Sequence, residues 1–180
     1  MDNFGKNEDK LNRIIMKQLL LLSLIFLAAV AANAQTGELV LEKGVSAHKE
    51  IDAIYKSFSE AYRTLDVEKV ANLYTENAAY LPPDNDILQG REAIRPTFKS
   101  FFDWIKKEGL TMTISFQILQ RKADTNLAFD VGIYTIRQFK DGKPIGTEGK
   151  GKFVVVAVRE KDGKWRFQVD GYSNLKPSKQ

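Results

Sequence analysis

The hydrophobic period of this chain changes once, near Gly109. Before that point, apolar residues recur at three- and four-residue spacing over residues 51–65 and again over 94–105. After it, apolar and polar residues alternate strictly over residues 111–118. The first pattern predicts amphipathic helices and the second predicts a half-buried antiparallel strand. Helices followed by an antiparallel meander predict an α+β domain, with three N-terminal helices packed on one face of a sheet.

Capping residues set the expected bounds of the first two helices. Residues 35–45 show neither period and are expected to form a flexible leader. Ser46 is the expected N-cap of a first helix that runs to about residue 65. Asp66 is the expected cap of a second, shorter helix whose buried face includes Tyr74.

Proline and glycine residues mark the next boundaries. A short strand over residues 78–81 should end at the Pro-Pro pair 82–83, because proline cannot donate to a strand ladder. Gly90 is expected to open a third helix and Gly109 to end it. Pro96 lies inside this helix and predicts a kink or a late start.

Three further strands are predicted over residues 127–139, 147–158 and 165–173. Asp-Gly pairs at residues 141–142 and 162–163 separate the last three runs and favour hairpins. The domain is therefore expected to span residues 46–175, followed by a tail over residues 176–180.

Residues 1–34 have the pattern of a secretory signal peptide. An apolar run over residues 19–30 follows a basic stretch and ends in Ala32-Asn33-Ala34, the small-residue motif of a cleavage site. Cleavage is predicted after Ala34, which would export the protein to the periplasm or the medium. An N-terminal anchor helix is the alternative. Residues 1–15 are polar, and they fit an over-extended start with Met16 as the initiator.

Composition narrows the classes of function. The net charge is +4 with no basic block, which argues against nucleic acid as a partner. The chain has no cysteine, so cysteine nucleophiles and disulfides are excluded. No membrane association is expected once the signal peptide is removed.

Four stretches carry a family resemblance: LDVEKV, LYTENAAYLPP, QGREAIRPTF and DGKWRFQVDGYSN. They resemble the SnoaL-like group of the nuclear-transport-factor-2-like (NTF2-like) superfamily, over about residues 46–175. The resemblance implies a cone, in which a curved sheet wraps around the long first helix, often as a homodimer through the sheet. It implies no single activity, because the superfamily includes isomerases, cyclases, dehydratases, binding modules and association domains.

The ketosteroid isomerases of this superfamily offer a direct test of catalysis. Their reaction needs an aspartate base together with a tyrosine and a protonated aspartic acid as oxyanion donors. Aligned through AAYLPP, the base falls on Pro82, the tyrosine on Phe58 and the second acid near Gly151 or Lys152. None of these residues is the required aspartate base, tyrosine donor or aspartic acid donor, so steroid-type isomerisation is not expected.

Metal and cofactor chemistry finds little support in the sequence. The single histidine, His48, starts the first helix, so neither a histidine-rich metal site nor a histidine-based triad can be built. Asp84 and Asp86 share one exposed loop and are too few for a carboxylate-only metal site. Their structural or solvating role is the preferred interpretation, and neither a metal nor a cofactor is expected.

The candidate ligand-binding residues are those that could line the interior of a cone: Phe58, Tyr62, Tyr80, Trp104, Phe116, Asp130 and Tyr134. Ordinary core packing is the alternative for the aromatic members. Asp130 and Tyr134 share a strand face with Gly132, and this polar-bearing face could instead be a solvent or dimer surface. In that case the opposite face, with residues 129, 131 and 133, would be the inner one.

Asp170 is the first candidate for a functional carboxylate, with Tyr80 as its tyrosine partner. In a regular strand Asp170 would face away from Trp165 and Phe167, but a bulge at Gly171 could change this. A buried aspartate there would have a raised pKa and could act as an acid or base. The alternative is a surface aspartate paired with Lys152 or Arg166.

Three functions remain open. The first is an exported domain that binds a small apolar or amphipathic molecule, as a homodimer. The second is an enzyme of the cyclase, dehydratase or isomerase kind that uses Asp170. The third is an association module whose cone is filled by its own side chains. A measured cavity separates the third function from the other two.

Overall fold

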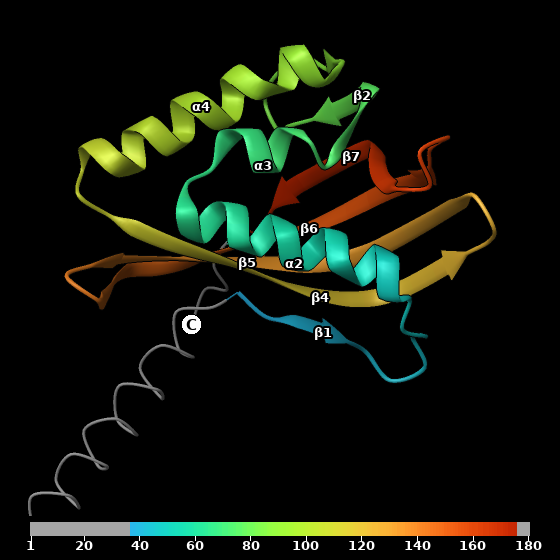
Figure 1. The fold of residues 1–180 in the computed structure, drawn as a ribbon. Coiled ribbons are helices and arrows are strands. Elements are labelled where there is room, and N and C mark those ends of the chain that lie inside the picture. Colours follow the sequence, from blue (N-terminus) through green and yellow to red (C-terminus); the bar gives the residue numbers. More distant parts are fainter. Residues whose placement is uncertain (1–36, 176–180) are drawn as a thin grey trace, which may run out of the picture. The chain divides into compact units, whose positions relative to one another are not determined.

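The computed structural model describes residues 37–175 (Figure 1). The predicted signal peptide and the tail over residues 176–180 lie outside the described residues. Among residues 37–175, the strands form one seven-stranded sheet in the order β1-β4-β5-β6-β7-β2-β3. Figure 1 shows α2, α3 and α4 together on one side of this curved sheet. The α+β prediction is therefore confirmed.

Helix α2 (Lys49–Thr64) is capped by His48 rather than by Ser46. The His48 Nδ1 atom accepts a hydrogen bond from the Ile51 amide at 3.3 Å, as N-cap side chains do. The helix ends at Leu65, which takes a left-handed conformation with φ of 53°. The predicted cap of the second helix is confirmed, because Asp66 accepts a hydrogen bond from the Lys69 amide at the start of α3 (Val67–Ala71).

Helix α4 (Arg91–Lys107) begins immediately after Gly90, as predicted. The expected late start at Pro96 is wrong. Proline removes only the bond to the carbonyl of Glu92, four residues earlier, and the rest of the helix continues past it. Glu108 is the C-cap, and Gly109 follows with a φ of 66°.

The strands are longer than their sequence patterns indicated. They are β2 (Tyr74–Leu81), β3 (Leu88–Gln89), β4 (Thr111–Ala123), β5 (Leu127–Lys140), β6 (Lys143–Arg159) and β7 (Trp165–Asn174). Tyr74 was expected on α3 but begins β2, where it pairs with Phe167 of β7. The predicted stop at Pro82 and the Asp141-Gly142 hairpin are confirmed, and both hairpin residues have positive φ.

The predicted flexible leader is wrong in part. Residues Leu39–Leu41 form β1, which pairs in parallel with residues 116–118 of β4. Three residues are too short a run for a periodic signal, and their pairing partner lies far away in the sequence.

One irregularity in β7 decides which of its side chains face the helices. In the β6–β7 ladder, Val156 pairs with Val169 and Ala157 pairs with Phe167, so Gln168 is an extra residue without a partner. Such a bulge shifts the alternation of the strand by one residue. Phe167 and Asp170 therefore both face inward, although the twofold pattern placed them on opposite faces. The bulge lies at Gln168 and not at Gly171, the position that the sequence suggested.

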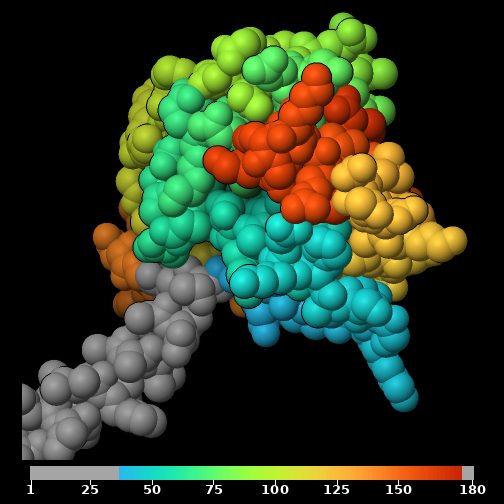
Figure 2. Space-filling view, turned by 45° about the vertical axis from the view of Figure 1, so that its right-hand side comes forward, coloured from blue at the N-terminus to red at the C-terminus, as the bar shows by residue number. Residues whose placement is uncertain are grey.

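Contacts hold the first turn of α2 against two hairpins. The Trp165 indole donates a hydrogen bond to Glu50 at 3.2 Å, and Arg121 pairs with Asp52 at 2.5 Å. Figure 2 shows the start of α2, in cyan, beside the β6–β7 turn in orange-red and the β4–β5 turn in yellow. Among residues 37–175, no helix is both long and apolar enough to cross a bilayer.

Candidate functional site

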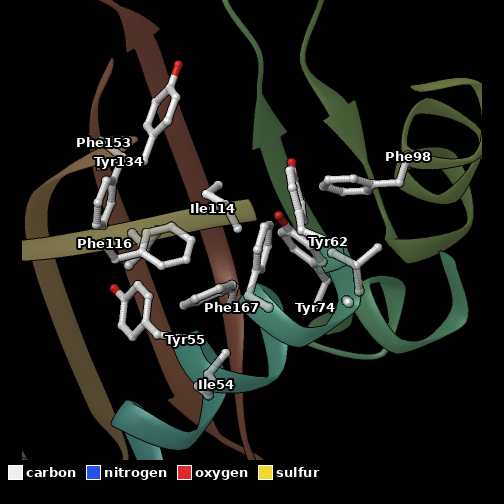
Figure 3. Close-up of a cluster of buried hydrophobic side chains, with 14 of the residues drawn as sticks. Ile54, Tyr55, Tyr62, Tyr74, Phe98, Ile114, Phe116, Tyr134, Phe153 and Phe167 are labelled. Atoms are coloured by element: carbon white, nitrogen blue, oxygen red, sulfur yellow. The ribbon is translucent and has the colours of Figure 1, made fainter. Parts of the chain in front are cut away.

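A cavity of about 340 Å³ lies between the helices and the inner face of the sheet. Figure 3 shows side chains from α2, α4 and the strands converging on this interior. The lining is mainly aromatic: Tyr55, Phe58, Tyr62, Tyr80, Thr97, Phe98, Phe101, Ile114, Phe116, Tyr134, Ile136, Phe153, Val155, Phe167, Asp170, Tyr172 and Asn174. A space of this volume can hold a small organic molecule rather than a few waters.

Asp170 supplies the carboxyl group of this cavity and is only 8% exposed. The Tyr74 hydroxyl donates a hydrogen bond to its Oδ2 atom at 2.6 Å. Within residues 37–175, this is the one hydrogen bond that the carboxyl group accepts from a side chain. The surface alternative, with Asp170 paired to Lys152 or Arg166, is wrong because the bulge turns Asp170 inward. Arg166 pairs instead with Glu160 and Asp162.

Burial raises the pKa of Asp170 to about 6, and the Tyr74 hydrogen bond opposes that rise. Desolvation disfavours the charged carboxylate, whereas a donated hydrogen bond favours it. The group thus exchanges its proton close to neutral pH, which a general acid or base requires. Burial likewise raises the pKa of Tyr80 and Tyr172, so both hydroxyls stay neutral and can act as donors.

The side of the cavity near the end of β7 is more polar than the rest. The Tyr134 hydroxyl donates a hydrogen bond to Asn174 Oδ1 at 2.8 Å, and both residues line the cavity. Thr97 of α4 also lines the cavity but is exposed, so it marks an opening to solvent. The cavity that contains Asp170 is therefore open to solvent on the side of α4.

Five of the seven residues proposed to bind ligand line the cavity: Phe58, Tyr62, Tyr80, Phe116 and Tyr134. Trp104 does not. Its side chain is 47% exposed and stacks on Phe101, with ring centroids 6.4 Å apart. Trp104 was expected to line the interior of the cone, but the buried face of α4 runs through Phe98, Phe102 and Ile105.

Asp130 also lies outside the cavity lining. It is 1% exposed and forms a two-bonded ion pair with Arg121, both at 2.8 Å. The Tyr55 hydroxyl donates a further hydrogen bond to it at 2.8 Å. The strand face that carries Asp130 and Tyr134 is therefore the inner face of the sheet, and its assignment as a solvent or dimer surface is wrong.

Tyr74, and not Tyr80 as the sequence suggested, is the hydrogen-bond partner of Asp170. Tyr80 is the Cα partner of Asp170 in the β2–β7 ladder and packs on Tyr172 at 5.7 Å between centroids, but Tyr74 makes the hydrogen bond. Tyr74 was missed because its spacing from Val67 and Val70 fits a helix. Tyr172 and Asn174 were missed as cavity residues because they follow the bulge.

The described residues hold no group of three or more histidine, aspartate or glutamate side chains that could bind a metal ion. The position aligned with the isomerase base, Pro82, ends β2 and is not part of the cavity lining. Phe58 does line the cavity but carries no hydroxyl. The acid that this cavity offers, Asp170, comes from a different strand position than the isomerase pattern implies.

Comparisons with known proteins support the fold. A ketosteroid isomerase-like protein from Erwinia carotovora atroseptica is 15% identical, with a TM-score of 0.57, over 72% of this chain and 96% of that chain. An NTF2-like protein with a cystatin-like fold from Novosphingobium aromaticivorans is 16% identical, with a TM-score of 0.60, over 72% and 82%. A putative calcium/calmodulin-dependent protein kinase II association domain from Xanthomonas campestris is 25% identical, with a TM-score of 0.57, over 78% and 96%.

No curated protein matches the chain. The SnoaL-like domain family matches residues 55–168, which is more than half of the chain. This range contains Tyr55, Phe58 and Tyr62 of α2 and extends to the bulge residue Gln168. The chain therefore belongs to the SnoaL-like domain family and has the cone-shaped fold of NTF2-like and ketosteroid isomerase-like proteins.

Proposed function

We propose that the protein is an exported domain that binds a small apolar or amphipathic molecule in its aromatic cavity. The cavity volume of about 340 Å³ is the observation that carries this proposal. A domain that served only to associate with partners could fill this space with its own side chains. An open, mainly aromatic cavity with a few polar groups has the composition of a small-molecule site.

The proposal is tested by titration with N-phenyl-1-naphthylamine, a neutral apolar dye whose fluorescence rises in an apolar site. Wild-type protein should bind the dye saturably. Ile136 lines the cavity and is only half-buried, so Ile136→Trp should fill the space and weaken binding at least about tenfold. Val154→Trp is the matched control, because Val154 is 50% exposed and outside the cavity lining. No saturable binding by the wild-type protein, or equal binding by both variants, would contradict the proposal.

Export is the second part of the proposal and rests on the sequence of residues 1–34 alone. Mature protein recovered from the periplasm or medium should begin at Gln35. N-terminal sequencing measures this directly, and recovery of uncleaved protein from the cytoplasm would argue against export.

Catalysis is the alternative function, and the Asp170–Tyr74 pair favours it. A carboxyl group with a pKa of about 6 can take up and release a proton during turnover near neutral pH. Such an enzyme would be of the cyclase, dehydratase or isomerase kind. Conversion of ligands recovered from the cavity, followed by mass spectrometry, distinguishes catalysis from binding.

A homodimer through the outer face of the sheet also belongs to the proposal. Val154 is exposed on that face, and its Cα partner Val131 lies beside it on β5. The neighbouring pair of Phe129 and Val156 extends the apolar surface along the same two strands. Exposed apolar surface of this kind favours association, here with a second copy of the chain.

A further inference from the structure

The cavity contains an acid without a cationic counterpart. Asp170 is the one acidic residue of the lining, and among the described residues no lysine, arginine or histidine lines the cavity. Tyr74 donates to Oδ2, whereas Oδ1 receives no hydrogen bond from residues 37–175. An ionised carboxylate in such surroundings lacks most of the stabilisation that water would provide.

The groups around this carboxyl group are aromatic rings. Tyr80 and Tyr172 pack against each other at 5.7 Å between centroids, and Tyr134 packs on Tyr172 at 5.8 Å. All three rings line the cavity together with Asp170. Aromatic faces attract cations through the negative charge of their π-systems, and this attraction is stronger where water is excluded.

We propose that the cavity selects an organic cation, with one positively charged nitrogen bound at Asp170 and an apolar body packed among the aromatic rings. This inference rests on the proposed binding function and narrows its ligand class. The ligand's nitrogen would supply a positive charge next to Asp170 and would donate a hydrogen bond to its Oδ1 atom, which receives none from residues 37–175. The opposite polarity, an anionic ligand, would bring two negative charges together in a site without a cation.

The charge on Asp170 makes the selection dependent on pH. The other titratable groups that line the cavity or contact Asp170 are hydroxyls with raised pKa, neutral between pH 5 and 8: Tyr55 and Tyr62 from α2, Tyr74 and Tyr80 from β2, Tyr134 from β5 and Tyr172 from β7. The lining residues of α4, β4 and β6 carry no titratable group. The nearest acid along the sheet, Asp130, is already paired with Arg121. Titration of Asp170 alone should therefore control the binding of a cation.

Three indole compounds of similar shape test the inference by calorimetry: tryptamine is a cation, tryptophol is neutral and indole-3-acetate is an anion. At about pH 7.5, tryptamine should bind roughly tenfold more tightly than tryptophol, and indole-3-acetate most weakly. Because the pKa of Asp170 is about 6, its protonation should weaken tryptamine binding about tenfold at pH 5. Tryptophol binding should change much less over this range.

Asp170→Asn keeps the shape of the side chain and removes its charge. In this variant the advantage of tryptamine over tryptophol should disappear at both pH values. Asp103→Asn is the control, because Asp103 is an exposed carboxylate on α4 outside the cavity lining. If Asp170→Asn does not fold, the wild-type series of three compounds at two pH values still decides the question.

Equal or tighter binding of tryptophol or indole-3-acetate would overturn the inference, as would an unchanged preference in Asp170→Asn. Failure of all three compounds to bind would also overturn it, if the protein still takes up N-phenyl-1-naphthylamine. In that case the cavity binds ligands but does not select cations. If the dye does not bind either, the proposed binding function is wrong, and the inference about cations is wrong with it.

Discussion

Asp130 and Asp170 lie in one row across the inner face of the sheet, on either side of Val155. Val155 of β6 is the Cα partner of Asp130 on β5 and of Asp170 on β7. Both carboxyl groups are buried, but within the described part of the chain only Asp130 has a cationic partner, Arg121. The row thus places two buried carboxyl groups two strands apart, one stabilised by an ion pair and the other by a single tyrosine hydrogen bond. Substitutions at the two positions should have opposite effects on stability.

Asp170→Asn should stabilise the protein at neutral pH. The pKa of Asp170 rises from 3.8 to about 6 on folding, so its ionisation opposes the folded state. Its contribution to stability is complete below about pH 4 and is lost as the pH rises through 6. At about pH 7.5 the variant should gain up to about 3 kcal/mol in free energy of unfolding, and little at pH 4. Urea unfolding across this pH range measures the difference, and a variant that is less stable at every pH would contradict it.

Asp130→Asn should destabilise the protein. The substitution leaves the Arg121 guanidinium, whose side chain is 2% exposed, with Asp52 as its remaining carboxylate partner. Breaking one partner from a buried ion pair costs about 3 to 5 kcal/mol. The same urea experiment measures this loss, and a change below about 0.5 kcal/mol would mean that the pair contributes little.

Tyr74→Phe should raise the pKa of Asp170 above 6. The Tyr74 hydroxyl stabilises the ionised carboxylate, so its removal leaves burial unopposed. Tyr80→Phe is the matched control, because no hydrogen bond joins the Tyr80 and Asp170 side chains in the described structure. Carbon-13 NMR titration of the carboxyl group reports the pKa of each variant. An equal shift in both would show that the hydrogen bond is not the cause.

Val154→Lys should weaken the proposed homodimer without affecting ligand binding. Val154 lies on the outer face of the sheet, so a charge there would be buried by a second copy but exposed in a monomer. Light scattering after size exclusion gives the mass at several concentrations. A wild-type protein that is monomeric throughout, or a variant dimer of unchanged strength, would rule out this surface.

The sequence predicted the fold well because each of its signals was local. The period change near Gly109, the Asp66 cap and the Asp141-Gly142 turn each depend on a few neighbouring residues, and each is confirmed. Strand β1 could not be predicted in this way. Its pairing with residues 116–118 joins distant parts of the chain, and such a contact leaves no periodic trace in three residues.

The site was less predictable because it depends on register. Phe58, Tyr62 and Phe116 follow regular periods and do line the cavity, as expected. The role of Asp130 as an ion-pair partner depends on its position opposite Arg121 in the β4–β5 ladder. This pairing follows from the register of the β4–β5 hairpin, which the sequence pattern did not specify. Tyr74 became a partner of Asp170 only through the parallel pairing of β2 with β7, which no local pattern reveals.

The bulge at Gln168 lets two different sequence spacings place an acid in the cavity. Loss of Gln168 would leave Phe167 paired with Ala157 and Val169 paired with Val156, now in a regular strand. Phe167 and Asp170 would then be two residues apart and would both still face the helices. A single-codon deletion could thus remove the bulge and keep the acid, so relatives with a regular β7 should carry the acid two residues after the aromatic residue.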